Sequence, residues 1–466
     1  MDTTDRNRTG EQAHERDTSG AQLYPTEHST LTQSLGDALP KPAAAPALLS
    51  SSVPTSSSTY DAYAALRFRE FRLLAAGRFL AALGEQMLGV AVGWELYERT
   101  HSALALGLVG LVQVLPIFML ALPAGHIADR FERKRIVLGT AVLLALGAIG
   151  LALLSYSHGS LPLFYGSLLL IGMANAFAGP ASSTLLPQTV PPAIFTNAAT
   201  WSSSSWQVAA VIGPALSGGL IALNHSATPV YLLVALANII VVVMTTVMRS
   251  RQQSHADEAP TVQSMLAGVG FIRRSKVILA AITLDLFAVL FGGAVTLLPI
   301  FADDYLHVGA AGLGLLRAAP SLGAVGMALT LAHLPPLRHA GKTLLWAVAG
   351  FGIATIVFGI SRSFLLSLAM LAVLGALDNV SVVIRSTLLL IHVPDDLRGR
   401  ISAVNNVFVG ASNELGGFES GLTAALIGPV LSVIGGGVGT ILVVIVVALI
   451  WPEMRRLRQI TSIDIH

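Results

Sequence analysis

Twelve long apolar runs follow one another along most of this chain. Each has close to the roughly 20 residues that a helix needs to cross the hydrocarbon core of a bilayer. The composition agrees, because 53% of the 466 residues are hydrophobic and only 12% are charged, about half the charged fraction of soluble domains. Lipid offers the backbone no hydrogen-bond partners, so such runs must fold as helices. We therefore predict an all-α membrane protein with twelve transmembrane helices, over residues 72–97, 103–126, 136–156, 162–186, 197–223, 229–248, 277–301, 310–333, 343–361, 364–391, 401–427 and 431–451.

The residues before the first run have a different character. Residues 1–60 are polar, rich in Ser, Thr and Pro, and lack the short apolar core of a cleavable signal peptide. We expect them to form a disordered cytoplasmic tail. The chain has no cysteine, which excludes disulfides and thiolate chemistry. It also lacks a Gly-rich phosphate loop followed by Lys and Ser or Thr, so we expect no ATP hydrolysis. No pair of histidines has metal-ligand spacing, and we expect no enzymatic activity, no cofactor and no bound metal.

Cations are distributed unequally between the two sides of the predicted membrane. The connections on the side shared by both termini are rich in Arg and Lys, whereas the opposite connections offer only Arg99 and Arg362. The positive-inside rule then places both termini in the cytoplasm. Residues 249–276 become a cytoplasmic linker and residues 452–466 a second cytoplasmic tail. We predict a multi-pass protein of the bacterial inner (plasma) membrane.

Short elements recur at a constant offset of 203 residues, the distance from Ser183 to Ser386. Ser183-Thr184-Leu185-Leu186 recurs as Ser386-Thr387-Leu388-Leu389. The same offset relates Gly213 to Gly416 and Gly218 to Gly421. These repeats predict two pseudo-symmetric six-helix bundles, over residues 61–248 and 277–451.

A strongly charged loop, residues 125–135, joins the second and third predicted helices. Gly would let the two helices approach closely, and the cations would anchor the loop at the inner leaflet. The loop resembles the conserved G-x-x-x-D-R-x-G-R-[RK] element of major facilitator superfamily transporters, with Glu132 where that family usually has Gly. The resemblance implies the major facilitator fold and a cytoplasmic gate; the alternative is a merely positive-inside loop with chance spacing. The matching residues are Gly125, Asp129, Arg130, Arg133 and Lys134.

Two further elements narrow the resemblance. Gly213, Pro214 and Gly218 in the fifth run resemble the G-P-x-x-G-G element of exporters and antiporters, although generic packing of small residues is an alternative explanation. Residues 93–100, 394–400 and 410–416 resemble the enterobactin-exporter-like branch, which contains siderophore exporters and drug-efflux proteins. The resemblance covers residues 65–455.

Several charged or polar side chains fall where the hydrocarbon core should exclude them. Each ionised group costs about 2.5–3.5 kcal/mol at a helix centre, so such groups usually face a cavity. A rise of about 1.5 Å per residue places Glu85, Asp378 and Glu414 near the midplane. Each acid could instead form a structural ion pair with a neighbouring helix. The predicted substrate- and proton-coupling residues are Glu85, Asp378, Glu414, Asn175, Asp285 and Arg317.

These features predict a secondary active transporter that exports siderophore or drug-like small molecules by proton antiport and alternating access. Its expected partners are the small-molecule substrate, protons and membrane lipids, without nucleic acid, and we expect a monomer. Three alternatives stay open: a lipid or lysolipid flippase, an uptake carrier on the same fold, and a non-transporting membrane sensor or scaffold.

Overall fold

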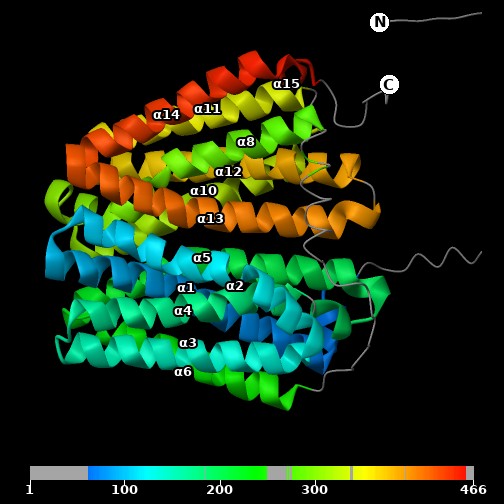
Figure 1. Cartoon of the computed structure of the whole chain (residues 1–466), viewed down its shortest axis with the longest axis vertical. Coiled ribbons are helices and arrows are strands. Elements are labelled where there is room, and N and C mark those ends of the chain that lie inside the picture. The colour runs from blue at the N-terminus through cyan, green and yellow to red at the C-terminus, as the bar shows by residue number, and fades with distance from the viewer. Residues whose placement is uncertain are drawn as a thin grey trace, which may run out of the picture. The chain divides into compact units, whose positions relative to one another are not determined.

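A computed structural model describes residues 61–183, 185–248, 270, 272, 275–335, 339–393 and 395–457. Within that part of the chain, the side chains at 121–130, 179–183, 395–400, 402–404, 406 and 407 are not described. Every regular element among the described residues is helical, and Figure 1 shows the helices running roughly side by side. The predicted all-α class is confirmed.

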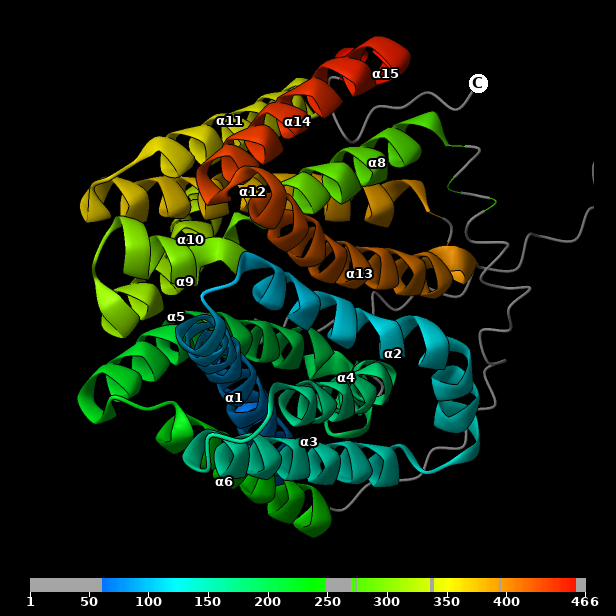
Figure 2. The same cartoon turned by 60° about the vertical axis from the view of Figure 1, so that its left-hand side comes forward.

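Six long helices form the N-terminal bundle and six helical segments of similar length form the C-terminal bundle (Figures 1 and 2). Eleven of the twelve are long and apolar enough to cross a membrane, and the twelfth, α13, has 33 residues. The N-terminal bundle comprises α1 (Arg69–Thr100), α2 (Ala103–Arg130), α3 (Arg133–Tyr156), α4 (Leu161–Ser183), α5 (Phe195–Asn224) and α6 (Thr228–Val247). The C-terminal bundle comprises α8 (Lys276–Phe291) with its continuation, α10 (Gly309–His333), α11 (Ala340–Ile360), α12 (Phe364–His392), α13 (Asp395–Ile427) and α14 (Pro429–Ile450), followed by the short α15 (Pro452–Arg456).

The seventh span differs from the prediction of one helix over residues 277–301. The α-helix α8 ends at Phe291, and the chain continues through a 3-10 turn (Gly293–Leu297), α9 (Leu298–Ile300) and a π turn (Phe301–Tyr305). At Gly293 a side chain would meet the carbonyl oxygen of Gly416 in α13 at 2.5 Å, so the backbone needs glycine there. Pro299 has no N–H to donate to a regular helix. Close approach of α13 and one proline therefore interrupt this span.

The repeated residues make equivalent contacts in the two bundles. Gly213 of α5 lies against α1, where a Cβ would sit 3.2 Å from the carbonyl oxygen of Leu83. Its counterpart Gly416 of α13 lies against α8, where a Cβ would sit 2.9 Å from the carbonyl oxygen of Leu290. One turn after Gly213, the hydroxyl of Ser217 donates to the carbonyl oxygen of Met87 in α1 at 2.9 Å. The predicted pseudo-symmetry is confirmed at the level of individual contacts.

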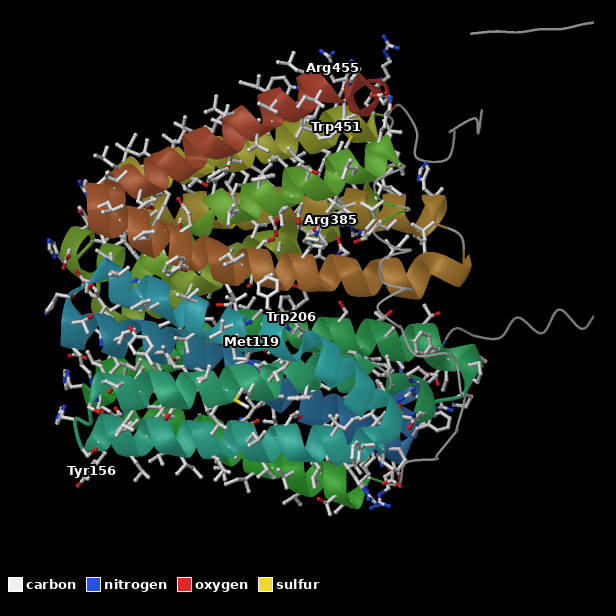
Figure 3. The ribbon with its side chains drawn as sticks, in the orientation of Figure 1. Met119, Tyr156, Trp206, Arg385, Trp451 and Arg455 are labelled. Carbon is white, nitrogen blue, oxygen red and sulfur yellow. The ribbon has the colours of Figure 1, made fainter. Side chains whose placement is uncertain are left out.

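The two ends of the helices are named here for their connections. The linker end holds the start of α1 and the end of α6, and the far end holds the end of α1 and the start of α2. In Figure 3, Tyr156 marks the far end and Arg455 the linker end. Helices α1, α3 and α5 and the broken seventh span are each followed, at the far end, by a histidine with positive φ. His is one of the few side chains that adopts this left-handed conformation readily. These residues are His101, His158, His225 and His307.

The bundles meet through α5 with α10 and through α2 with α13, and both contacts are tightest in the far half. Gly218 of α5 lies so close to Gly314 of α10 that a Cβ there would sit 2.8 Å from the Gly314 Cα. In the pseudo-symmetric contact, a Cβ at Gly107 of α2 would sit 2.9 Å from the Cα of Gly421 in α13. Small residues allow the two bundles to close at the far end.

Toward the linker end, glycines of these helices have no such close neighbours. A Cβ at Gly326 of α10 or Gly410 of α13 would meet no atom within 4 Å. Phe118 of α2 is 54% exposed, although Gly110 and Val114, earlier on the same stripe, are buried. Trp206 of α5 is 51% exposed and lies at the level where the two bundles face each other (Figure 3). Among the described residues, the closest glycine contacts between the bundles therefore lie in the far half, and side chains of the same helices become exposed toward the linker end.

Candidate functional site

Arg317 of α10 crosses from the C-terminal bundle to the N-terminal bundle. Its Nη2 lies 2.8 Å from the position that a Cβ would occupy at Gly89 of α1. Any other side chain at position 89 would displace the guanidinium, so the glycine makes room for it. Glu85 lies one helical turn before Gly89 on the same face of α1. The arginine is thus brought to the same stretch of α1 as the predicted acid.

Glu414 of α13 completes a cluster with these two residues. Its carboxylate is close enough for its charge to interact with that of Arg317 and with that of Glu85. None of the three forms an ion pair within 4 Å of another, so the charges influence one another without being locked together. Glu85, Arg317 and Glu414 are hereafter called the central cluster. The sequence placed Glu85 and Glu414 at a similar depth, and the helix arrangement brings Arg317 to them.

The central cluster lies beside the point where the bundles close. Next to Glu414, the backbone of α13 approaches Gly110 of α2, which is buried and has no room for a side chain. Glu85 is exposed, whereas Arg317 and Glu414 are half-buried. Exposed and half-buried charges in mid-helix positions are typical of residues that face an aqueous cavity rather than lipid. Whether the cluster takes part in transport stays a prediction.

Asp378 and Asn175 lie outside this cluster. Asp378 of α12 is half-buried and forms no ion pair with any described residue. One turn earlier, Gly375 fits against the backbone of Pro320 in α10, so this part of α12 is fixed to α10. Asn175 of α4 is also half-buried, with no side-chain hydrogen bond to another described residue. The structure places neither of them in contact with Glu414 or Glu85.

Asp285 has a structural partner. Its carboxylate forms an ion pair with Arg385 of α12, and both residues are only 6% exposed. Figure 3 shows Arg385 inside the C-terminal bundle. The pair links α8 to α12 across 100 residues of sequence, from 285 to 385. The sequence left two possibilities for Asp285, a coupling role or a structural ion pair. The structure contains the ion pair.

Part of the predicted gate loop lies outside the described side chains. Gly125, Asp129 and Arg130 fall at the end of α2, where only the backbone is described. Arg133 and Lys134 begin α3, and the Nζ of Lys134 donates to the carbonyl oxygens of Thr246 and Met248 at 2.9 and 2.6 Å. Lys134 thus neutralises the negative end of the α6 dipole. The gating role of the loop stays a prediction.

A hydrogen bond joins the two bundles at the far end. The hydroxyl of Tyr97 in α1 donates to the carboxylate of Asp304 at 2.5 Å. Asp304 lies in the π turn that ends the seventh span. Close by, Gly93 of α1 faces Pro299, with 3.2 Å between the proline ring and the position of a Cβ. We call the Tyr97–Asp304 bond the far-end latch. Nothing in the sequence alone pairs Asp304 with Tyr97.

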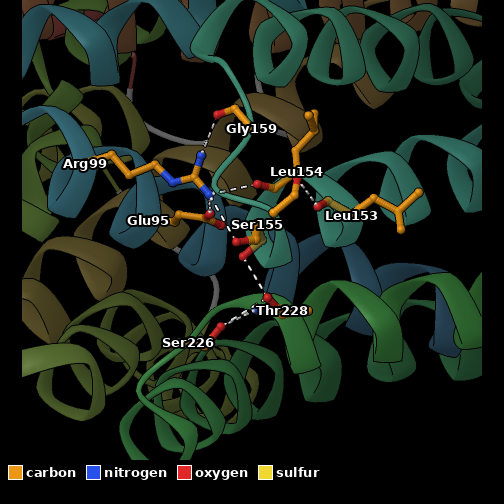
Figure 4. Close-up of polar contacts among 9 residues, drawn as sticks. Glu95, Arg99, Leu153, Leu154, Ser155, Gly159, Ser226 and Thr228 are labelled. Carbon is orange, nitrogen blue, oxygen red and sulfur yellow. Dashed lines mark hydrogen bonds and ion pairs between the residues drawn. The ribbon is translucent and has the colours of Figure 1, made fainter.

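A second polar network stiffens the far end of the N-terminal bundle (Figure 4). Arg99 forms an ion pair with Glu95 and donates to the carbonyl oxygen of Gly159 at 3.1 Å. It also caps carbonyl groups at the end of α3, where a cation stabilises the helix dipole. The hydroxyls of Ser155 and Thr228 extend the network to α6 at 2.9 Å. The network lies within the N-terminal bundle, so it holds α1, α3 and α6 together. No group of three His, Asp or Glu side chains in the described part of the chain is placed to hold a metal ion.

The sequence matches one protein family along most of its length. Residues 60–465 fit the model of a major facilitator family described as transmembrane secretion effector. Among relatives, the enterobactin exporter EntS of Citrobacter koseri is 28% identical over 394 residues, which cover 84% of this chain and 93% of the relative. The enterobactin exporter EntS of Shigella boydii is 27% identical with the same coverage.

Solved transporter structures share the fold. A bacterial homologue of the human lysosomal transporter Spinster, in an inward-facing and occupied conformation, superimposes with a TM-score of 0.66 at 15% identity. The match covers 83% of this chain and 96% of that one. The transporter PepTSo superimposes with a TM-score of 0.65 at 14% identity, covering 83% of this chain and 98% of that one. The predicted arrangement of two six-helix bundles is that of the major facilitator fold.

Proposed function

The chain belongs to the transmembrane secretion effector family of the major facilitator superfamily, and from this premise we propose that it exports a small molecule by exchange for protons. It is a multi-pass membrane transporter rather than an enzyme. Because its relatives are enterobactin exporters of bacteria, siderophore-like or drug-like compounds are the proposed substrates and the inner membrane is the proposed location. The fold supports alternating access, in which one bundle rocks against the other around a central site.

The central cluster is the observation that carries the proposal. Glu85, Arg317 and Glu414 come from three helices of both bundles and lie where the bundles close. With both acids ionised the cluster has one net negative charge, and with both protonated it has one net positive charge. Proton binding therefore inverts the charge that a substrate meets. A site of this kind can hold protons or a cationic or hydrogen-bond-donating substrate group, but it disfavours holding both.

Competition of this kind is what an antiporter requires. Substrate would enter from the open side and displace protons from Glu85 and Glu414. After the bundles rock, protons from the far side would displace the substrate and neutralise the acids for the return. We propose that Asp378, half-buried on α12, serves as an additional proton site in this exchange. Arg317 would keep the central acids from carrying two uncompensated charges within the membrane.

The direction of transport follows from the proposed orientation. We place the linker end in the cytoplasm, because the cations of the predicted loops gather there. The described state, with its close contacts between the bundles in the far half, would then load substrate from the cytoplasm. The loop containing Gly125, Asp129 and Arg133 would form the cytoplasmic gate, closing when the far-end latch opens. Export rests on this orientation together with the exporter relatives.

Accumulation in inverted vesicles tests the proposal. Vesicles holding the wild type, energised by an acidic interior, should accumulate at least one compound from a panel of siderophores, macrolides and cationic dyes. Glu85→Gln and Glu414→Gln should lose accumulation, while Glu98→Gln, a change of the same kind at an exposed far-end position, should retain it. Unimpaired accumulation in both cluster variants would remove the cluster from the transport path. Accumulation only with the opposite gradient would indicate uptake.

A further inference from the structure

An open groove of about 540 Å³ lies on the C-terminal bundle, between α11 and α12 near the linker end. Its rim carries His339, Lys342 and Thr343, which are the residue before α11 and the first turn of that helix. Trp346 follows one turn deeper and is 75% exposed. The groove is separate from the central cluster, and transport as proposed above does not use it.

We propose that this groove binds an anionic phospholipid, with the phosphate of the headgroup at the rim and the acyl chains over the floor. The floor consists of Ala347, Leu377 and Val380, all apolar. A phospholipid with its phosphate at the rim would cover this apolar floor with its acyl chains. A soluble anion would leave the floor uncovered.

The level of the groove in the membrane suits such a lipid. Helix α11 has 21 residues, so it is about 31 Å long, close to the roughly 30 Å thickness of a hydrocarbon core. Its first residue therefore lies at the boundary between hydrocarbon and headgroups. Trp346, six residues further on, lies about 9 Å deeper along the helix. At that depth its exposed ring would lie against the acyl chains of a lipid bound in the groove.

The charge of the rim also favours an anion. Lys342 is exposed and has no carboxylate partner among the described residues. Glu453 of α15, an acid at the same end of the bundle, already binds Lys276 at 2.9 Å. In the first turn of α11 the N–H of Gly341 donates to the carbonyl oxygen of Leu457 at 3.4 Å, so the attraction for an anion comes from Lys342 and from the positive end of the helix dipole. A zwitterionic headgroup would bring its own cation against the rim.

The pseudo-symmetric helix in the other bundle provides a contrast. Lys134, in the first turn of α3, is committed to two carbonyl oxygens at the end of α6. Lys342, in the first turn of α11, donates to no described protein group. One lysine has a structural partner within the bundle, and the other remains available to a ligand from the membrane.

Quenching of tryptophan fluorescence tests the assignment. The full chain, purified in a neutral detergent, is titrated with dibrominated phosphatidylglycerol and with dibrominated phosphatidylcholine. The chain contains five tryptophans, so the signal of Trp346 is the part of the quenching that the Trp346→Phe variant loses. That part should respond to phosphatidylglycerol at a lower mole fraction than to phosphatidylcholine. The preference should fall about fivefold in Lys342→Gln and be retained in Lys342→Arg.

A matched control and a competition complete the test. Arg69→Gln removes an exposed cation at the linker end of the other bundle, and it should leave the preference unchanged. Equal quenching by the two lipids, or an unchanged preference in Lys342→Gln, would overturn the proposal. Loss of the preference in millimolar inorganic phosphate would also overturn it, because the site would then be one for a soluble anion.

Discussion

Removal of the far-end latch should shift the protein toward the state that is open at the far end. In the Tyr97→Phe variant the ring remains, so the buried packing of this side chain, which is 4% exposed, is retained. The variant loses only the hydrogen bond to Asp304, 2.5 Å long. A hydrogen bond to a charged group contributes about 1.5–3 kcal/mol. Asp304 is exposed and water can replace the lost donor, so the appropriate figure lies at or just below the lower limit of this range, at about 1–1.5 kcal/mol.

Such a change corresponds to an approximately five- to tenfold shift in the equilibrium between the closed and open far end. The absence of native cysteine allows two spin labels to be attached at chosen positions. Tyr156 at the end of α3 is 81% exposed and Ile360 at the end of α11 is 59% exposed, so labels there should report the far-end distance between the bundles. Double electron–electron resonance on Tyr97→Phe should show a longer distance enriched about five- to tenfold over the wild type.

A second tyrosine supplies the control. The hydroxyl of Tyr165 donates to the carbonyl oxygen of Ala105 at 2.8 Å, within the N-terminal bundle. Tyr165→Phe removes the same atom without touching the contact between the bundles, so its distance distribution should match that of the wild type. An unchanged distribution in Tyr97→Phe, or an equal change in both variants, would refute the latch.

Three further changes have defined outcomes. Asp285→Asn leaves the charge of Arg385 buried without its partner, so it should lower the free energy of unfolding by about 3–5 kcal/mol, measured by denaturation in detergent. Gly314→Val places a side chain against the carbonyl oxygen of Pro214, at a typical cost of about 1–3 kcal/mol; the same label pair should report a wider far end, and an unaltered distance would contradict the close packing. Asp129→Ala should reduce transport without abolishing expression, and full activity in that variant would exclude the gate.

The helices and their symmetry could be predicted from the sequence, because hydrophobic length and repeated glycines are local signals. The break in the seventh span could not be predicted as readily. Gly293 is visible in the sequence, but its significance comes from the backbone of α13, which approaches it from another part of the chain. Residues that depend on long-range contacts carry no local sign of their partners.

The central cluster could likewise be predicted only in part from the sequence. Depth in the helices identified Glu85, Arg317 and Glu414 as unusual, and the pairing of α1, α10 and α13 was needed to unite them. The same depth criterion also selected Asp285, whose ion pair with Arg385 gives it a structural role. A charge in mid-membrane thus indicates either a site or a structural pair, and only tertiary structure distinguishes them.

The most direct test of the proposed exchange is proton release on substrate binding. The purified protein, in weakly buffered detergent solution with a pH indicator, is mixed with a compound that it transports. Because substrate and protons compete for the central cluster, the wild type should release protons on binding, and the Glu85→Gln/Glu414→Gln double variant should release none. Substrate binding by the wild type without proton release, or equal release by the double variant, would contradict exchange at Glu85 and Glu414.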